Sequence, residues 1–273
     1  MPRWLSGREE FLQARFGDSL AIISQPEHKR VRLEVACRSK AEAQEIVRDF
    51  GGRVTRLGRN WLERFAREQK SKPLKIGKRL VISRKGDLQI APAVQKQPVL
   101  VIPATTAFGT GEHPTTAMSL RVLEELTRGW KLGWSIVDLG TGTGILALAA
   151  KRLGACHVLG IDNDPMAIST AKNNARSNKL GGISFQLCDA HSWKPPGRID
   201  ILIANLFSEL VIELLPKFQC AQWLILSGIL RAQEQQIVHA LQQYRIDLVK
   251  IRRRGKWIAI LARNSRPAAR TGS

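Results

Sequence analysis

The sequence has few cysteines, and they are far apart. Its 273 residues include four, Cys37, Cys156, Cys188 and Cys220, and no two of them form a CxxC pair. This spacing argues against a disulfide framework and favours a reducing compartment. The sequence also lacks the closely spaced cysteines and histidines of a structural zinc site, so we predict no bound metal.

Long apolar runs are also missing. No stretch approaches the roughly 20 apolar residues that a membrane-spanning helix needs. The first residues, "MPRWLSGREEF", lack the apolar core of an export signal. We therefore expect a cytoplasmic protein without a membrane segment. Hydrophobic residues still make up 44% of the chain, which is enough for a packed core.

Acidic residues are scarce relative to basic ones. The chain has 23 Asp and Glu against 43 Lys and Arg, a formal net charge of +20. The segment "KIRRRGK" at 250–256 concentrates part of this charge. Such a balance favours polyanionic surroundings such as RNA or a ribosome, and rRNA proximity is one expectation. The alternative is a solvated basic surface, since the charges follow no recognisable nucleic-acid-binding motif.

The N-terminal part has the pattern of a small α+β domain, predicted over residues 1–58. Strands are expected at 20–24 ("LAIIS"), 30–36 ("RVRLEVA") and 53–58 ("RVTRLG"). A helix is expected at 40–52, ending in two glycines that suit a C-cap. Residues 59–97 are interpreted as a linker, with a short helix in "NWLERFAREQK" and one strand in "KPLKIGKRLVIS".

From residue 98 to 262, apolar strands alternate with amphipathic helices. Such alternation predicts an α/β domain with a mostly parallel sheet and helices on both faces. The last two strands surround Gly255, which predicts an antiparallel hairpin at the sheet edge. Residues 263–273 are predicted to be a disordered tail.

A glycine-rich turn, "VDLGTGTG" (137–144), joins a buried strand to a helix. Glycines allow close backbone approach to a ligand, and a helix N-terminus offers free N–H groups. The GxGxG spacing is neither a dinucleotide fingerprint nor a P-loop. Asp162 ends the next strand, 22 residues after Gly140, where a carboxylate can accept hydrogen bonds from ribose hydroxyls. Together with Asp138, this context predicts a nucleoside-containing ligand.

This pattern resembles the S-adenosylmethionine-dependent methyltransferases of the Rossmann-like class. That class has a seven-stranded sheet whose last strands form an antiparallel hairpin. The resemblance implies S-adenosyl-L-methionine as the cofactor. It also implies that Asp189, in "LCDA", lies where this class often contacts adenine; the alternative role for Asp189 is a cap at the end of the strand.

A second stretch, "AFGTGEHPTT" (107–116), narrows the family. It resembles the signature of the ribosomal protein L-eleven methyltransferases (PrmA type). "DILIANLFSELVIELLP" and "LILSGIL" resemble the same family's later strands, and the match covers roughly residues 60–262. The resemblance implies methylation of lysine or α-amino groups of that ribosomal protein, free or in the ribosome. It also implies that the N-terminal domain recognises the substrate.

Carried over to this sequence, the resemblance implies a set of ligand contacts. The cofactor-binding residues would be Thr116, Gly140, Gly142, Asp162 and Asn205, with Phe108 lining the same pocket. Asn205 is also the proposed catalytic residue, because an amide oxygen at a strand end can orient an incoming amine. Methyl transfer depends mainly on proximity and alignment. The amine must be neutral, whereas a lysine with a pKa near 10.4 is mostly protonated at pH 7.

His113 has three possible roles. A metal ligand would need partners at ligand spacing, and Glu112 is adjacent instead. A general base is possible, and so is an orienting role where a helix begins at Pro114.

The alternative to the leading function is a methyltransferase of another protein or of rRNA. A non-catalytic binding module is disfavoured by the intact glycine turn and strand-end residues.

Overall fold

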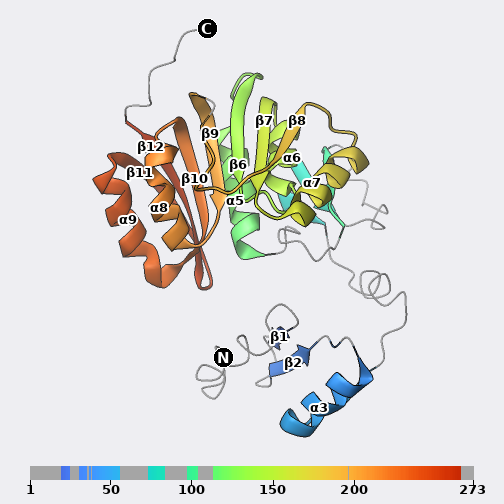
Figure 1. Cartoon of the computed structure of the whole chain (residues 1–273). Helices are drawn as coiled ribbons and strands as arrows, with labels where there is room; N and C mark the ends of the chain where they lie inside the picture. Colours follow the sequence, from blue (N-terminus) through green and yellow to red (C-terminus); the bar gives the residue numbers. More distant parts are fainter. Residues whose placement is uncertain are drawn as a thin grey trace. The chain divides into compact units, whose positions relative to one another are not determined.

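The computed structural model describes residues 20–24, 31–35, 37, 39–55, 73–83, 97–103, 113–195 and 197–265. The chain divides into two compact units, Met1–Phe65 and Ala66–Ser273 (Figure 1). Among the described helices, none has the length and apolar composition that crossing a bilayer requires.

In the first unit, a strand pair is followed by a helix. Strands β1 (Leu20–Ser24) and β2 (Val31–Val35) pair antiparallel. Helix α3 (Lys40–Phe50) begins after Ser39, whose side chain accepts a hydrogen bond from the backbone N–H of Glu42. It ends at Gly51, whose φ of 74° suits glycine. The strand predicted over 53–58 is absent at residues 53–55, and the rest of that range lies outside the described residues.

The second unit is built on a seven-stranded sheet with the order β11-β12-β10-β9-β6-β7-β8. Neighbouring strands from β10 to β8 run parallel, while β12 pairs antiparallel with both β10 and β11. This confirms the predicted Rossmann-like sheet and its C-terminal antiparallel hairpin. The strands are β6 (Trp134–Leu139), β7 (Ala155–Asp162), β8 (Ile183–Leu187), β9 (Ile199–Asn205), β10 (Ala221–Leu230), β11 (Ile246–Arg254) and β12 (Trp257–Asn264).

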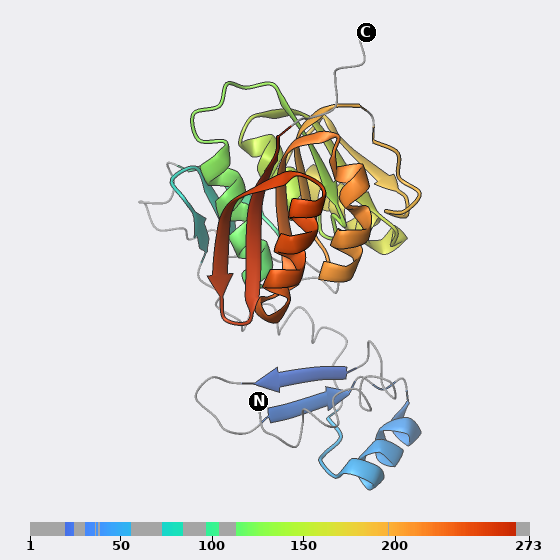
Figure 2. The same ribbon diagram turned by 90° about the vertical axis from the view of Figure 1, so that its left-hand side faces the viewer.

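Helices cover both faces of this sheet (Figure 2). One apolar core joins a sheet face to α5 (Pro114–Leu126) and α6 (Ile145–Arg152), and α7 (Pro165–Ser177) adds Ala175 to it. A second core joins the other face to α8 (Ser208–Phe218) and α9 (Glu234–Gln243). A 3₁₀ turn, Arg231–Gln233, precedes α9. Because each apolar helix stripe is buried on the sheet, the strand ends are held in fixed positions.

A small three-stranded sheet packs beside α5. Its strands are β3 (Leu74–Ile76), β4 (Leu80–Ser83) and β5 (Val99–Val101), with β4 in the middle. The sequence predicted a single strand across 72–83, but a turn at Gly77, with φ of 55°, splits it in two. Ile76 and Leu80 are fully buried in the same core as α5. The range predicted as a linker therefore supplies residues to the core of the second unit. The domain boundaries proposed at residues 58, 97 and 262 stay predictions.

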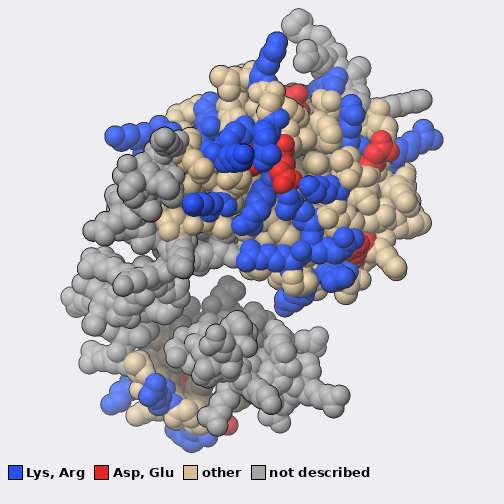
Figure 3. Space-filling model, turned by 180° about the vertical axis from the view of Figure 1, so that it is seen from behind, with Lys and Arg blue, Asp and Glu red and all other residues tan. Residues whose placement is uncertain are grey.

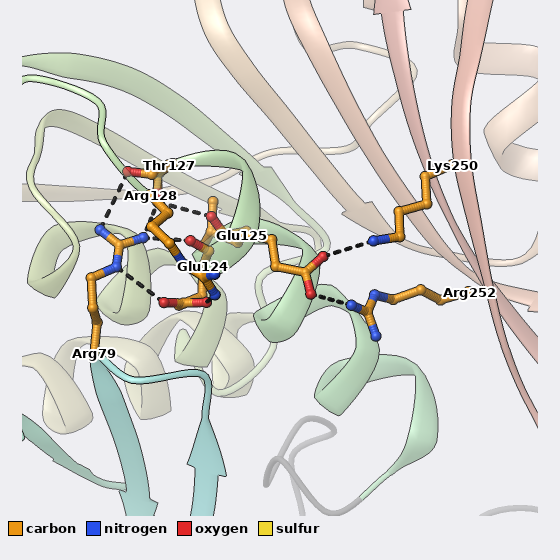
Figure 4. Close-up of polar contacts among 8 residues, drawn as sticks. Arg79, Glu124, Glu125, Thr127, Arg128, Lys250 and Arg252 are labelled. Atoms are coloured by element: carbon orange, nitrogen blue, oxygen red, sulfur yellow. Dashed lines mark hydrogen bonds and ion pairs between the residues drawn. The ribbon is translucent and has the colours of Figure 1, made fainter.

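The small sheet is fastened to α5 by Arg79 (Figure 4). Its guanidinium donates to the carboxylate of buried Glu124 at 3.2 Å. It also donates to the Thr127 hydroxyl at 2.9 Å and to the carbonyl of Glu124. These contacts satisfy carbonyl groups that the end of α5 leaves without helical partners.

The last strand runs two residues into the predicted tail. Asn264 ends β12 and is buried, and its side-chain amide donates to the carbonyls of Phe218 and Ala221. Residues 266–273 lie outside the described residues.

Candidate functional site

A cavity of about 640 Å³ opens where the parallel strands end. Its wall includes Leu139 at the end of β6, Asp162 at the end of β7 and Asn205 at the end of β9. Strand β6 lies between β7 and β9, so the chain order reverses there. Open α/β sheets bind ligands at such switch points, and the volume suits a small molecule.

The glycine turn forms the floor of this cavity. Gly140, Gly142 and Gly144 all have positive φ, at 75°, 53° and 80°. A side chain at Gly140 would meet Leu206 at 2.6 Å, so the close backbone approach depends on glycine there. Gly140 and Gly142 both line the cavity, and their contact with a cofactor stays a prediction.

Asp138 holds the turn from behind. Its Oδ2 accepts hydrogen bonds from the Thr141 hydroxyl at 2.7 Å and from the Ala147 N–H at 3.1 Å. Its Oδ1 is buried and has no hydrogen-bond partner within the described structure. Burial raises the pKa of Asp138 to about 7, and the nearby charge of Asp162 adds to the rise. Asp138 is thus a structural support for the turn.

Asp162 faces the cavity with an oriented carboxylate. Its Oδ2 accepts from the N–H of Gly142 at 2.9 Å, and its Oδ1 accepts from the N–H of Asp164 at 3.0 Å. Each oxygen keeps a further lone pair for a ligand hydroxyl. Asp189 lines the next part of the wall beside Cys188, and its Oδ1 accepts from the N–H of His191 at 2.7 Å.

Asn205 is positioned by a chain of buried hydroxyls. Ser227, its parallel neighbour on β10, donates to Asn205 Oδ1 at 2.9 Å. The hydroxyl oxygens of Ser119 and Ser227 lie 2.6 Å apart. Because Ser227 donates its one hydroxyl proton to Asn205, Ser119 must donate to Ser227. The chain links α5, β10 and β9 to the side chain that we predicted to be catalytic.

Thr116 lies behind this chain, outside the cavity wall. It is 1% exposed, and its hydroxyl accepts a long 3.4 Å hydrogen bond from Asn205 Nδ2. Its neighbour Thr115 lines the cavity. The sequence therefore indicates that the start of α5 lies at the site, but it does not indicate which of the two threonines lines the cavity. Phe108 lies outside the described residues.

His113 and Trp257 form another part of the cavity wall. His113 Nδ1 is 2.6 Å from the Thr115 hydroxyl, and its ring meets Trp257 edge-on, with centroids 5.0 Å apart. Burial, and then the charge of Lys256, lower the pKa of His113, so the ring is neutral near pH 7. Within the described parts of the chain, no cluster of three His, Cys, Asp or Glu side chains could hold a metal ion. The contacts of His113 with Thr115 and Trp257 fit the orienting role, one of the three roles that the sequence suggests for this residue.

Several wall residues were not predicted. Phe207 follows β9 and is 74% exposed at the cavity, beside Leu206. Gly228 interrupts β10 at a bulge, with φ of 85°. A glycine inside an apolar strand is a sequence signal for such a bulge. Ser227 and Trp257 carry no comparable local signal.

The model of the family described as ribosomal protein L11 methyltransferase (PrmA) matches residues 29–265. A ribosomal protein L11 methyltransferase of Pelobacter propionicus is 36% identical over 202 residues, which cover 71% of this chain and 64% of that protein. The chain thus spans less than two thirds of that relative. One from Symbiobacterium thermophilum is 33% identical over 245 residues, which cover 86% of this chain and 76% of that protein.

A solved structure agrees with the sequence relatives. The crystal structure of ribosomal protein L11 methylase from Lactobacillus delbrueckii subsp. bulgaricus matches with a TM-score of 0.64 at 26% identity. The match covers 72% of this chain and 100% of the solved chain. With its glycine turn, its sheet order and these matches, the chain belongs to the ribosomal protein L11 methyltransferase (PrmA) family.

Proposed function

We propose that this protein is an S-adenosyl-L-methionine-dependent N-methyltransferase that methylates lysine or α-amino groups of ribosomal protein L11. The observation that carries the proposal is the convergence of the glycine turn, Asp162 and Asn205 on one cavity. The family membership supports the choice of substrate.

The cavity fits the cofactor that the family implies. The positive φ of Gly140 favours glycine at the turn, where an added Cβ would also meet the Leu206 side chain, and the Asp162 carboxylate is aimed by two backbone N–H groups. Asp162 would hold the ribose hydroxyls, and the wall at Cys188 and Asp189 would hold the adenine. When bound, S-adenosyl-L-methionine supplies a methyl group on a positively charged sulfur.

Asn205 is the residue proposed to orient the amine. One lone pair of its Oδ1 takes the Ser227 hydroxyl, which leaves the other for an amine N–H. Holding the nitrogen in line for displacement accounts for most of the expected rate. Thr116 supports this geometry through Nδ2 and stays a proposed contact of the cofactor site.

The walls around Asn205 are proposed to admit the substrate side chain. Phe207 is an exposed aromatic ring that can cover the aliphatic part of a lysine. Burying the ammonium disfavours its charged form, which brings the amine towards the neutral state it needs. A ribosomal protein substrate also places the reaction in the cytoplasm.

The cofactor half of the proposal is tested by calorimetric titration of S-adenosylhomocysteine into the full chain. Asp162→Ala should abolish or strongly weaken binding. Asn173→Ala, on the exposed face of α7, serves as the matched control and should bind like the unmodified protein. Equal binding by Asp162→Ala would reject this cavity as the cofactor site.

The acceptor half is tested with methyl-labelled cofactor and ribosomal subunits, followed by separation of protein from RNA. The proposal predicts label in ribosomal protein L11. Label in another ribosomal protein, or in rRNA alone, would support the alternative acceptors and reject the named substrate.

A further inference from the structure

A group of cations lies on the α5 side of the sheet, next to the cavity. Lys250, Arg252 and Arg254 occupy alternate positions of β11, and Arg121 comes from the facing helix. Lys256 follows in the hairpin turn, with its ammonium 5.4 Å from the ring centre of Trp257. We call these five residues the hairpin patch. Figure 3, seen from behind, shows Lys and Arg gathered over this face of the domain with few acids between them.

The hairpin patch has little internal compensation. Glu125 of α5 forms ion pairs with Lys250, at 3.1 Å, and with Arg252 (Figure 4). Among the residues that the structure describes, no carboxylate pairs with Arg121, Arg254 or Lys256. Within the described part of the chain, three of the five cations therefore have no ion-pair partner.

The cations of the hairpin patch also act on one another. Arg121 is half-buried, and its guanidinium contacts the carbonyl of Ala117, which is neutral. Burial, and then the charges of Arg254 and Arg252, lower the pKa of Arg121. Like charges gathered in this way raise the energy of the free protein, and a bound polyanion relieves them.

The shape of the patch favours a linear partner. Alternate residues of an extended strand lie about 6.8 Å apart on one face, so the β11 cations form a row. The planar guanidinium of arginine can donate two parallel hydrogen bonds to a phosphate group. The formal net charge of the protein, +20, also favours a polyanionic partner. Arg254, at one end of this row, pairs with Trp257, which lines the cavity. A linear polyanion bound along the row would therefore lie beside the cavity.

We infer that the hairpin patch binds the phosphate backbone of RNA and holds the domain beside its protein substrate. The contact is with phosphates, so it is independent of base sequence. This inference needs no methyl transfer, and binding can be measured without cofactor. Its failure is therefore distinguishable from a failure of the proposed function.

The test measures binding of a fluorescently labelled RNA hairpin to the full chain by anisotropy, across about 50 to 200 mM salt. Arg121→Gln/Arg254→Gln should bind more weakly. Its slope of log affinity against log salt should fall by about two, roughly one per lost phosphate contact. Arg121→Lys/Arg254→Lys keeps both charges and should restore most of the slope, which separates charge from packing.

The control removes two cations at the opposite edge of the sheet. Lys172→Gln/Arg176→Gln lies on α7, which packs at β7 and β8, and it should bind RNA like the unmodified protein. An equal loss in both double variants would overturn the inference, because it would indicate general charge attraction. Unchanged binding by the patch variant would also overturn it. So would polyglutamate competing as well as unlabelled RNA, which would point to an acidic protein.

Discussion

The Ser227 hydroxyl donates a 2.9 Å hydrogen bond to the side-chain oxygen of Asn205, its neighbour on the adjacent parallel strand. Ser227 accepts in turn from Ser119, and both of these serines are fully buried. The orientation of the Asn205 amide is therefore set by protein contacts before any ligand arrives.

Ser227→Ala should slow turnover more than it weakens cofactor binding. A buried hydrogen bond contributes about 1 kcal/mol, so kcat should fall roughly 5- to 10-fold. Cofactor affinity should change little, because Ser227 does not line the cavity. Steady-state kinetics and calorimetry check this split. Ser177→Ala, exposed at the end of α7, is the control. A large loss of cofactor affinity with normal kcat would contradict the positioning role.

The buried carboxyl of Asp138 should make stability depend on pH. Because burial raises its pKa to about 7, the folded protein binds this proton more tightly than the unfolded chain does. The free energy of unfolding should therefore decrease as pH rises from about 4 to 7, by up to about 1.4 kcal/mol per pH unit from this group. Above pH 7 its contribution is constant.

Urea unfolding across this pH range checks the slope. Asp138→Asn keeps an oxygen for Thr141 and Ala147 but cannot titrate, so its stability should be less pH-dependent between 4 and 7. An unchanged slope in Asp138→Asn would place the titration on another group.

Gly228→Ala should both strain and block the bulge in β10. The residue has φ of 85°, and an added Cβ would lie 2.5 Å from the backbone oxygen of Leu206. Gly129→Ala is a matched control with φ of 92° and open space around it. The control should lose about 1 kcal/mol of stability from backbone strain, and Gly228→Ala should lose clearly more. Thermal unfolding of both variants measures the difference, and equal losses would show that the contact with Leu206 relaxes freely.

Arg79 should matter more to stability than its exposed neighbour. Although burial raises the pKa of Glu124, hydrogen bonds from Arg128 and Arg79 lower it overall, so the carboxylate is charged and needs its partners. Arg79→Ala also removes the contacts to the end of α5, and a loss of about 2 to 4 kcal/mol is expected. Lys78→Ala should be nearly neutral. Denaturant unfolding tests both, and matching stabilities would contradict the anchoring role.

The strand-end residues were accessible from the sequence, because their signals are local. Gly140, Asp162 and Asn205 each follow an apolar run that predicts a parallel strand, and parallel strands end at one edge of a sheet. Ser227 faces Asn205 only because β10 lies next to β9 in register, which no local pattern encodes. Trp257 reaches the cavity through the packing of the terminal hairpin on α5.

The other differences have similar causes. Thr115 lines the cavity and Thr116 does not, because neighbouring residues of a helix point in different directions and the sequence pattern does not say which of the two faces the site. The sequence predicts one strand for β3 and β4 because Gly77 is the one turn-forming residue between them, and the neighbouring Lys78 and Arg79 also fit the exposed face of a strand. Their burial depends on Arg79 and α5, which lies far away in sequence.

Intact-mass spectrometry of ribosomal protein L11, after incubation with this protein and S-adenosyl-L-methionine, shows whether the cavity transfers methyl groups to that substrate. The unmodified enzyme and Asn173→Ala should add whole methyl groups to amines of the substrate, and Asn205→Ala should add few or none. A substrate left unmodified by the intact enzyme, or methylated normally by Asn205→Ala, would contradict the account.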